Sequence, residues 1–420
     1  MLRTIRNFLL FFPFLNRFTN GIISLIKGRS ETTIPHVAGN EMKRVAEVLA
    51  SPGWNMSYGK GLMHERLEEK FAGYIGVRHA VAVNTGGMAI QMALRALGLR
   101  PGDEVMHQAD TCMANAFAVI NAFAAPVFAD ISPGTFMLDI EDAGRKVSPQ
   151  TKVVMPIHMW GNPDDMDKAL AFANKEKLHL LEDSSLALGA EWKGRKTGSF
   201  GIAGIFSFGC LKPVQAGEGG MITTNDESLA KELRTLRSWG EMTAEYGIRD
   251  NKELAWNGRM SEIVAAVALG QLEEYPNELE TLRSNVDTFR DYLGKRDGLE
   301  LVDPGENGKS AYNQVCLRIN PVGLRMTKAE LCRLLDINKI RYWHANFELI
   351  PGLQFFKNGH WEKYLLNNDI SRLRANYASR FTNAEKIYES TGIGLNKAHF
   401  SSKKSLNMLM KNLDRTLQAV

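Results

Sequence analysis

The sequence predicts an α/β protein with a mostly parallel, helix-covered sheet in a large domain and a smaller α+β domain at the C-terminus. Short apolar runs alternate with helical patterns from about residue 40 to residue 275, which is typical of a parallel sheet between helices. Short glycine strings follow several of these runs, as in α/β enzymes that bind phosphate groups. After Tyr275-Pro276, a charged helical stretch to about Lys295 leads into shorter mixed elements.

The composition narrows the class of protein. The 420 residues are 44% hydrophobic and 23% charged, which excludes disordered, collagen-like and coiled-coil chains. A formal charge of +4, with both signs interspersed, does not indicate a nucleic-acid-binding surface. The four cysteines form no CxxC pair, so we expect a reducing compartment, no disulfide scaffold and no metal site. We therefore expect a protein that binds small molecules.

The expected elements of the large domain follow one another along the chain. An apolar strand at 79–84 leads into a helix of Met, Ala and Leu residues at 86–98, which Gly98 ends. Further strands are expected at 125–130, 152–158, 178–183, 202–208 and 219–224.

The smaller domain has strand patterns at 312–319 and 340–345, and a helix that begins at Thr327. We expect a continuous helix across the boundary between the two domains. The chain then divides into an N-terminal extension (1–35), a large domain (36–280) and a small domain (281–420).

Two charged residues stand at the ends of expected strands. Lys212 lies in a glycine-rich loop between two apolar strands, where neighbouring cations or desolvation would lower its pKa into the nucleophilic range; the alternative is a solvated surface charge. Asp183 follows Glu182 at the end of an apolar strand, where open α/β sheets bind their ligands. The alternative for Asp183 is a helix cap or a surface acid.

A third position opens the helix after the first strand. There the string NTGGMA places Thr85, Gly86 and Gly87 at the helix start. Free backbone N–H groups and the helix dipole favour a phosphate group at such a position. Glycine is common at helix starts, so this string alone is a weak indication.

Together these strings resemble the DegT/DnrJ/StrS aminotransferases, pyridoxal-phosphate (PLP) enzymes that act on keto sugars and related polyols. The resemblance runs from about residue 45 to 290 and more loosely over 310 to 370. It is carried, in order, by NTGGMA, PGDEV (101–105), TFMLD (135–139), PIHMWGNPDDMD (156–167), ED (182–183), GSFGIAGIFSF (198–208), Lys212, GEGGMITTND and WNGRMSEIVAAVALGQLE (256–273). It implies the fold-type-I architecture, with a seven-stranded mostly parallel sheet and a small C-terminal domain, and a homodimer with shared active sites.

The resemblance also implies roles for single residues. Lys212 would bond covalently to PLP and then move protons between the amino donor and the cofactor. Asp183 would keep the pyridine nitrogen of PLP protonated. Ser207, Thr85 and the backbone of Gly86 and Gly87 would hold the phosphate group.

Asn257 would reach the phosphate group of the cofactor in the partner subunit. Without the resemblance, a polar cap before the helix at 261–275 is the favoured interpretation of this residue.

Three positions depart from the pattern of the family. Cys112 stands where the family usually places an aromatic ring over the cofactor, Gly87 where it has Thr, and Leu186 where it has Gln or His. Each loss would weaken cofactor contacts by about 1 kcal/mol. We interpret these changes as a divergent branch with a shifted substrate.

Two further residues are candidates for substrate contact. His344 and Asn346 fall where the small domain of the family approaches the mouth of the site. The alternative is a purely structural role, which we also expect for His158 at the end of a strand.

The expected reaction moves an amino group from an amino acid, most simply glutamate, to a keto sugar or a nucleotide-linked keto sugar in surface-glycan or secondary-metabolite biosynthesis. Amination of a cyclitol is an alternative within the same chemistry. A non-catalytic regulatory or scaffold protein of the same fold is the rival hypothesis.

The first 30 residues carry five basic and no acidic side chains among apolar clusters such as FLLFFPFL. Three interpretations remain open: packing against the large domain or the dimer interface, peripheral binding to an anionic membrane, and a cleaved targeting segment. We expect a cytoplasmic enzyme, with the inner face of the membrane as a candidate location.

Overall fold

The computed structural model describes residues 40–52, 61–240, 254–344, 349–365 and 367–418. They belong to one unit, Val37–Val420. The N-terminal extension predicted at residues 1–35 lies outside the described residues, so its predicted boundary and role stay predictions.

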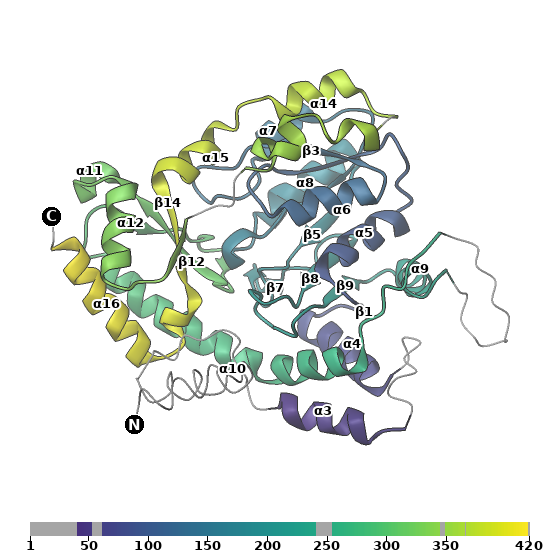
Figure 1. Cartoon of the computed structure of the whole chain (residues 1–420), viewed down its shortest axis with the longest axis horizontal. Helices are drawn as coiled ribbons and strands as arrows, with labels where there is room; N and C mark the ends of the chain where they lie inside the picture. The colour runs from purple at the N-terminus through teal and green to yellow at the C-terminus, as the bar shows by residue number, and fades with distance from the viewer. Residues whose placement is uncertain (1–39, 53–60, 241–253, 345–348, 366, 419–420) are drawn as a thin grey trace, which may run out of the picture. The chain divides into compact units, whose positions relative to one another are not determined.

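A seven-stranded sheet forms the centre of the large domain (Figure 1). β9 runs antiparallel to both of its neighbours, and the remaining neighbouring pairs are parallel. This arrangement confirms the predicted mostly parallel sheet. In spatial order the strands are β1 (His79–Val83), β9 (Gly220–Thr224), β8 (Ala203–Ser207), β5 (His179–Asp183), β4 (Thr151–Val154), β2 (Glu104–Gln108) and β3 (Ala125–Ala129).

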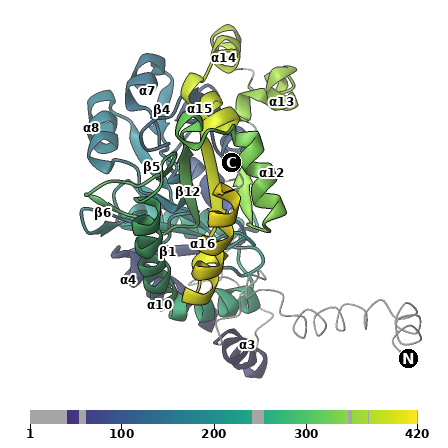
Figure 2. The ribbon, with the colours of Figure 1, turned by 90° about the vertical axis from the view of Figure 1, so that its left-hand side faces the viewer.

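Helices cover both faces of this sheet because alternate strand residues point to opposite sides. Val81 and Ile205 pack with α5 (Gly86–Ala96) and α9 (Glu227–Arg237) on one face of the sheet. Ala82 and Phe206 pack with α4 (Leu62–Ile75) and α10 (Glu262–Leu293) on the other face. The helices of the large domain are α3 (Glu41–Ala50), α4 (Leu62–Ile75), α5 (Gly86–Ala96), α6 (Met113–Asn121), α7 (Ile140–Lys146), α8 (Met166–Glu176) and α9 (Glu227–Arg237), with the short helix η1 (Met159–Gly161). Figure 2 shows α7 and α8 near β4 and β5.

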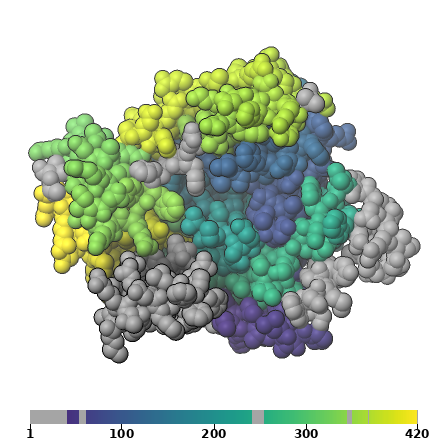
Figure 3. Space-filling model, viewed as in Figure 1, coloured from purple at the N-terminus to yellow at the C-terminus, as the bar shows by residue number. Residues whose placement is uncertain are grey.

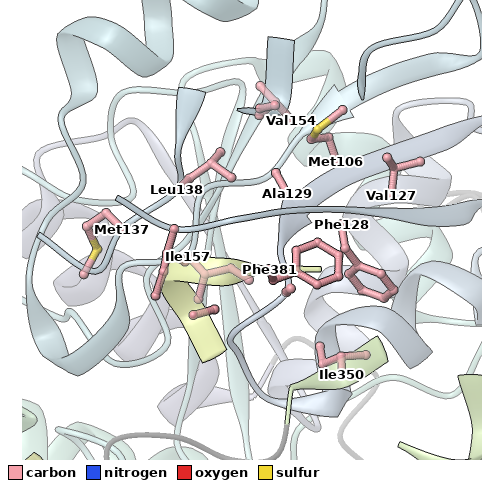
Figure 4. Packing of buried hydrophobic residues seen from close by; sticks show 14 of the residues in the cluster. Met106, Val127, Phe128, Ala129, Met137, Leu138, Val154, Ile157, Ile350 and Phe381 are labelled. Carbon is pink, nitrogen blue, oxygen red and sulfur yellow. The ribbon is translucent and has the colours of Figure 1, made fainter. Parts of the chain in front are cut away.

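The C-terminal part of the chain returns to cover the edge strand β3. Phe128 of β3 packs with Ile350 and Phe381 in the core shown in Figure 4. The amide side chain of Asn376 also bonds both the N–H and the C=O of Phe128, each at 2.9 Å. These bonds occupy the backbone groups of Phe128 that an added strand would need. This segment, visible at the top of Figure 3, contains η3 (Ile350–Gly352), α13 (Gln354–Lys357), η4 (Glu362–Tyr364), α14 (Ile370–Tyr377) and α15 (Thr382–Lys386).

A four-stranded antiparallel sheet forms the small domain and packs against α12, α16 and the end of α10. Its strands, in spatial order, are β10 (Leu299–Leu301), β12 (Gln314–Ile319), β14 (Gly392–Asn396) and β13 (Tyr342–His344). Its helices are α11 (Pro321–Leu324), α12 (Lys328–Ile337), η5 (Ile387–Thr391), η6 (Lys397–Phe400) and α16 (Lys403–Leu417). A three-stranded sheet of β11 (Gly308–Lys309), β6 (Glu191–Trp192) and β7 (Arg195–Lys196) lies apart from both larger sheets.

The helix α10 (Glu262–Leu293) connects the two sheets as one element and contains Pro276. A continuous helix is therefore present where the domain boundary is expected, at 280/281, and the division of the chain at that boundary stays a prediction. Among the helices that the structure describes, none combines the length and the hydropathy that a membrane span requires.

Candidate active site

The predicted site residues converge on one edge of the seven-stranded sheet. Val83 pairs with Gly220, and Gly220 pairs with Ser207, so the ends of β1 and β8 are adjacent to the start of β9. β5 runs parallel to β8 and ends at Asp183. The carboxyl ends of β1, β8 and β5 therefore meet at the edge where α/β sheets bind ligands.

The start of α5 and the end of β8 form a close-fitting cradle. A Cβ atom on Gly86 would lie 2.7 Å from Cβ of Ser207, and one on Gly220 would lie 2.5 Å from the carbonyl oxygen of Thr85. Glycine at both positions lets the backbone of the helix start approach Ser207. The Oγ1 atom of Thr85 accepts a bond from the N–H of Met88 at 3.0 Å as a helix cap, and its own proton remains free to donate.

The carboxylate of Asp183 is buried and is oriented by two donors. Nδ2 of Asn115 donates to Oδ2 at 2.5 Å, and the N–H of Ser185 donates to Oδ1 at 2.9 Å. Thr111 donates in turn to Oδ1 of Asn115 at 3.3 Å. All three polar side chains, Asp183, Asn115 and Thr111, are at most 4% exposed, which strengthens each bond in this low-dielectric site.

The sequence did not identify Asn115 or Thr111. Both lie in the string ADTCMAN (109–115), in which only Cys112 was a predicted site residue. Their pairing with Asp183 joins residues 68 positions apart, so no local pattern could reveal it.

Glu182 has a structural role on the opposite side of the strand from Asp183. Its carboxylate accepts bonds from the N–H groups of Gly198, Phe200 and Gly201 at 2.7 to 2.8 Å. His158 lies 3.3 Å from the same carboxylate through Nε2. His158 thus has a buried hydrogen-bond partner, as expected for a histidine at the end of a strand.

Lys212 is half-buried in the loop between β8 and β9. The loop is closed because Phe208 donates to the carbonyl of Gly219 and accepts from the N–H of Ala216. The carbonyl oxygen of Lys212 accepts bonds from Nε2 of Gln215 at 3.2 Å and from Nζ of Lys397 at 3.1 Å.

Two of the positions that depart from the family pattern lie three residues along the chain from Asp183 or from its donor Asn115. Cys112 is half-buried and precedes the first turn of α6, where its carbonyl accepts from the N–H of Asn115 at 3.1 Å. Leu186 is half-buried three residues after Asp183 and packs against the core that contains β4 and β5. Gly87 has no heavy atom within 4 Å of where its Cβ would lie, so this position is open.

Asn257 lies beside Asn84, the residue that precedes Thr85 at the start of the cradle. The side chain of Asn257 is exposed, and its carbonyl accepts from Nδ2 of Asn84 at 3.3 Å. His344 pairs with Ile393 at the end of β13. The side chain of His344 and all of Asn346 lie outside the described residues, so their contact with a substrate stays a prediction.

Comparison with known proteins connects this geometry to one family. Residues 35–359 match the DegT/DnrJ/EryC1/StrS aminotransferase family. A GDP-perosamine synthase from Caulobacter vibrioides is 36% identical over 315 residues, 73% of this chain and 82% of the relative. A putative L-glutamine:3-amino-2,3-dideoxy-scyllo-inosose aminotransferase from Streptoalloteichus tenebrarius is 32% identical over 289 residues, 68% of this chain and 70% of the relative.

The fold has solved counterparts. The X-ray structure of an aminotransferase from Psychrobacter cryohalolentis has a TM-score of 0.81 at 25% identity and covers 93% of this chain and 99% of that one. The predicted family, fold type and cofactor are thereby confirmed, whereas the role of each site residue stays a prediction. The chain belongs to the DegT/DnrJ/EryC1/StrS aminotransferase family, whose members are PLP-dependent enzymes.

Proposed function

We propose that this enzyme transfers an amino group from an amino acid, with glutamate as the expected donor, to the keto group of a free or nucleotide-linked sugar. The names of the two relatives support this substrate class, since one makes a nucleotide-linked amino sugar and the other aminates a cyclitol derivative. A cyclitol acceptor is the second candidate within the same chemistry. The product would serve surface-glycan or secondary-metabolite biosynthesis.

One observation carries the proposal: three groups that PLP chemistry requires meet at one sheet edge. The N-terminus of α5 beside Ser207 offers N–H and hydroxyl donors to a phosphate group. Asp183 offers a buried carboxylate to the pyridine nitrogen, and the loop after β8 carries the amine of Lys212. The donors at the start of α5 fit the phosphate group of PLP, the carboxylate fits its ring nitrogen, and the amine fits its aldehyde.

When bound, PLP supplies an electron-accepting ring that stabilises negative charge at the reacting carbon of the donor. Asp183 would hold a proton on the ring nitrogen, and Asn115 and the N–H of Ser185 orient its carboxylate for that contact. Nζ of Lys212 would hold the cofactor through its aldehyde carbon, with release of water, and once freed by the donor amine it would move the proton from the donor carbon to the cofactor.

Two of the three departures from the family pattern, Cys112 and Gly87, would widen the site. Cys112 replaces a ring by a small side chain, and the open space beside Gly87 is large enough for the missing side chain. We infer that this branch accepts a differently shaped sugar, with the covalent attachment and the phosphate cradle retained. The retained groups favour an enzyme over the rival scaffold protein.

We further propose a homodimer in which Asn257 contacts the phosphate group held by the partner subunit. Its exposed side chain is available for such a contact. An exposed apolar stripe on α3 also suits a subunit interface, since Met42 is 75% and Leu49 is 55% exposed, and their spacing places both on one face of the helix.

The basic and apolar residues 1–30 support a peripheral location at the inner face of the cytoplasmic membrane, because each basic residue near an anionic surface contributes about 1 kcal/mol. Flotation with anionic liposomes tests this proposal. The full chain should float at low salt and a chain that starts at Glu31 should not; equal behaviour of the two contradicts it.

A half-reaction screen tests the function. The protein is loaded with pyridoxamine phosphate, and the return of the cofactor to its aldehyde form is followed by absorbance with a panel of keto sugars and keto cyclitols. We expect a nucleotide-linked or free keto sugar to react fastest. A cyclitol that reacts faster than every sugar would select the second candidate.

Substitutions then locate the chemistry. Lys212→Ala should abolish turnover and the borohydride trapping of cofactor on that residue, and Asp183→Asn should keep bound PLP but react slowly. Lys231→Ala, an exposed lysine on α9, is the matched control and should behave as wild type. Near-normal turnover by Lys212→Ala would overturn the assigned site.

A further inference from the structure

A second lysine contacts the loop that carries Lys212. Lys397 begins the short helix η6 immediately after β14, and its Nζ donates to the carbonyl oxygen of Lys212 at 3.1 Å. The two residues are 185 positions apart and follow strands of different sheets, β8 and β14. This bond therefore joins the small domain to the backbone of the amine-bearing residue.

The backbone of Lys212 is held from three directions. Its N–H donates to the carbonyl of Gly209 at 3.1 Å. Its carbonyl accepts from Nε2 of Gln215 at 3.2 Å as well as from Lys397. Because the carbonyl and the side chain share one Cα atom, fixing the peptide plane limits the directions in which the side chain can leave the backbone.

The position of Lys397 is itself well determined. Asn396 pairs with Gln314 in the sheet, and its Oδ1 caps η6 by accepting from the N–H of Ala398 at 2.9 Å. The preceding Gly394 lies against Trp160 of the large domain, where a Cβ atom would come within 3.1 Å of the ring. The end of β14 is therefore fixed on both sides of the domain boundary.

The fold bears a cost to keep this ammonium in place. Burial lowers the pKa of Lys397 to about 8, against the opposing effect of Glu278 on α10. A methionine would fill a similar volume without this desolvation cost.

We propose that Lys397 is a positioning residue for the reaction: its ammonium holds the carbonyl of Lys212 and so aims the amine at the cofactor and the donor carbon. The proposal rests on the role assigned above to Lys212. Small misplacements of a reacting group are costly to the rate, whereas binding of the substrate depends on other contacts. Loss of Lys397 should therefore affect the rate more than the affinity.

The test uses the full chain loaded with PLP, with glutamate as the amino donor, and measures the half-reaction by stopped-flow absorbance. We expect Lys397→Met to lower the limiting rate about tenfold or more, with the apparent dissociation constants of glutamate and PLP changed by less than about threefold. Borohydride trapping on Lys212, followed by peptide mass spectrometry, should slow in parallel. The unfolding midpoint of the apoprotein should not fall.

A double-mutant cycle separates positioning from general stability. Gln215→Met removes the other donor to the same carbonyl, so the combined variant should lose more than the product of the two single losses. Lys403→Met, at an exposed position of α16, is the matched control and should keep the wild-type rate. Lys397→Gln replaces Lys397→Met in every measurement if the methionine variant does not fold.

The outcomes are distinct. Any one of four results would overturn the positioning role of Lys397. These are a rate within twofold of wild type, single losses that simply multiply in the double variant, an equal loss in the Lys403 control, and failure of both Lys397 variants to fold. If Lys212→Ala still traps the cofactor, the assigned site itself is wrong, and the Lys397 proposal falls with it. If Lys212→Ala loses trapping while the Lys397 variants behave as wild type, only the Lys397 proposal is wrong.

Discussion

The orientation of one carboxylate depends on residues that the sequence alone does not reveal. Asp183 ends a strand, whereas its donor Asn115 lies in the first turns of α6, with Thr111 behind it. In the role proposed for Asp183, the carboxylate must be aimed at the ring nitrogen of the cofactor. Nδ2 of Asn115 supports this role, because its bond to Oδ2 fixes the plane of the carboxylate.

Removing this donor should therefore slow the reaction without removing the cofactor. We expect Asn115→Ala to lower the limiting rate of the glutamate half-reaction by about 10- to 100-fold, on the scale of 1.5 to 3 kcal/mol for a hydrogen bond to a charged group. Asn121→Ala, exposed at the end of the same helix, is the control. A wild-type rate in Asn115→Ala, measured by stopped-flow absorbance, would show that Asp183 needs no such support.

Strand patterns predicted most of the large sheet, because its buried strands are continuous apolar runs. β2 escaped prediction since its sequence EVMHQ is largely polar, although every one of its residues is buried. Glu104 is tolerated there because Ser148, Thr151 and Arg372 bond its carboxylate. Local periodicity cannot reveal partners that are so distant in the chain. For this reason the sequence predicted neither the strand β2 nor the contact of Asn115 with Asp183.

The turn after β4 is a second element built from buried polar groups. Nδ1 of His158 accepts from the N–H of Asp164 at 3.0 Å, which leaves the proton on Nε2, the atom facing Glu182. Asp164 is 3% exposed, and burial raises its pKa to about 6. Its charged form is therefore disfavoured in the folded protein.

This raised pKa predicts a pH-dependent difference between two proteins. Since folded Asp164 binds its proton more tightly than unfolded Asp164, its contribution to stability falls as the pH rises from about 4 to about 6. Asp164→Asn lacks this titration, so its stability relative to wild type should increase over that range by up to about 3 kcal/mol. Urea unfolding at pH 4.5 and 7.5 measures the difference.

His107 serves as an internal check on this measurement. Burial lowers its pKa to about 4, so it titrates over a similar range with the opposite effect on stability. It is present in both proteins, and its contribution cancels from their difference. A difference that stays constant between the two pH values would mean that Asp164 is not the group responsible.

At the scale of the whole molecule, the two sheets are joined at several points around the site. The carbonyl of Gly161 accepts from the N–H of Ala311 at 2.8 Å and from Oγ of Ser310 at 3.0 Å. Lys397 adds its bond to Lys212. The small domain thus contributes to the position of residues in the large domain, so neither sheet alone defines the site.

If the site is also shared between subunits, two inactive chains should restore each other. A Lys212→Ala chain keeps Asn257, whose exposed side chain can contact the site of the partner. An Asn257→Ala chain keeps Lys212. In a two-fold symmetric dimer the two lesions fall in the same site and leave the other intact. An equal mixture should regain about a quarter of the wild-type activity, since half of the dimers are mixed and each has one working site.

Mass spectrometry of the intact dimers verifies subunit exchange. No recovery after exchange, or full activity of Asn257→Ala alone, would place Asn257 outside the partner's site.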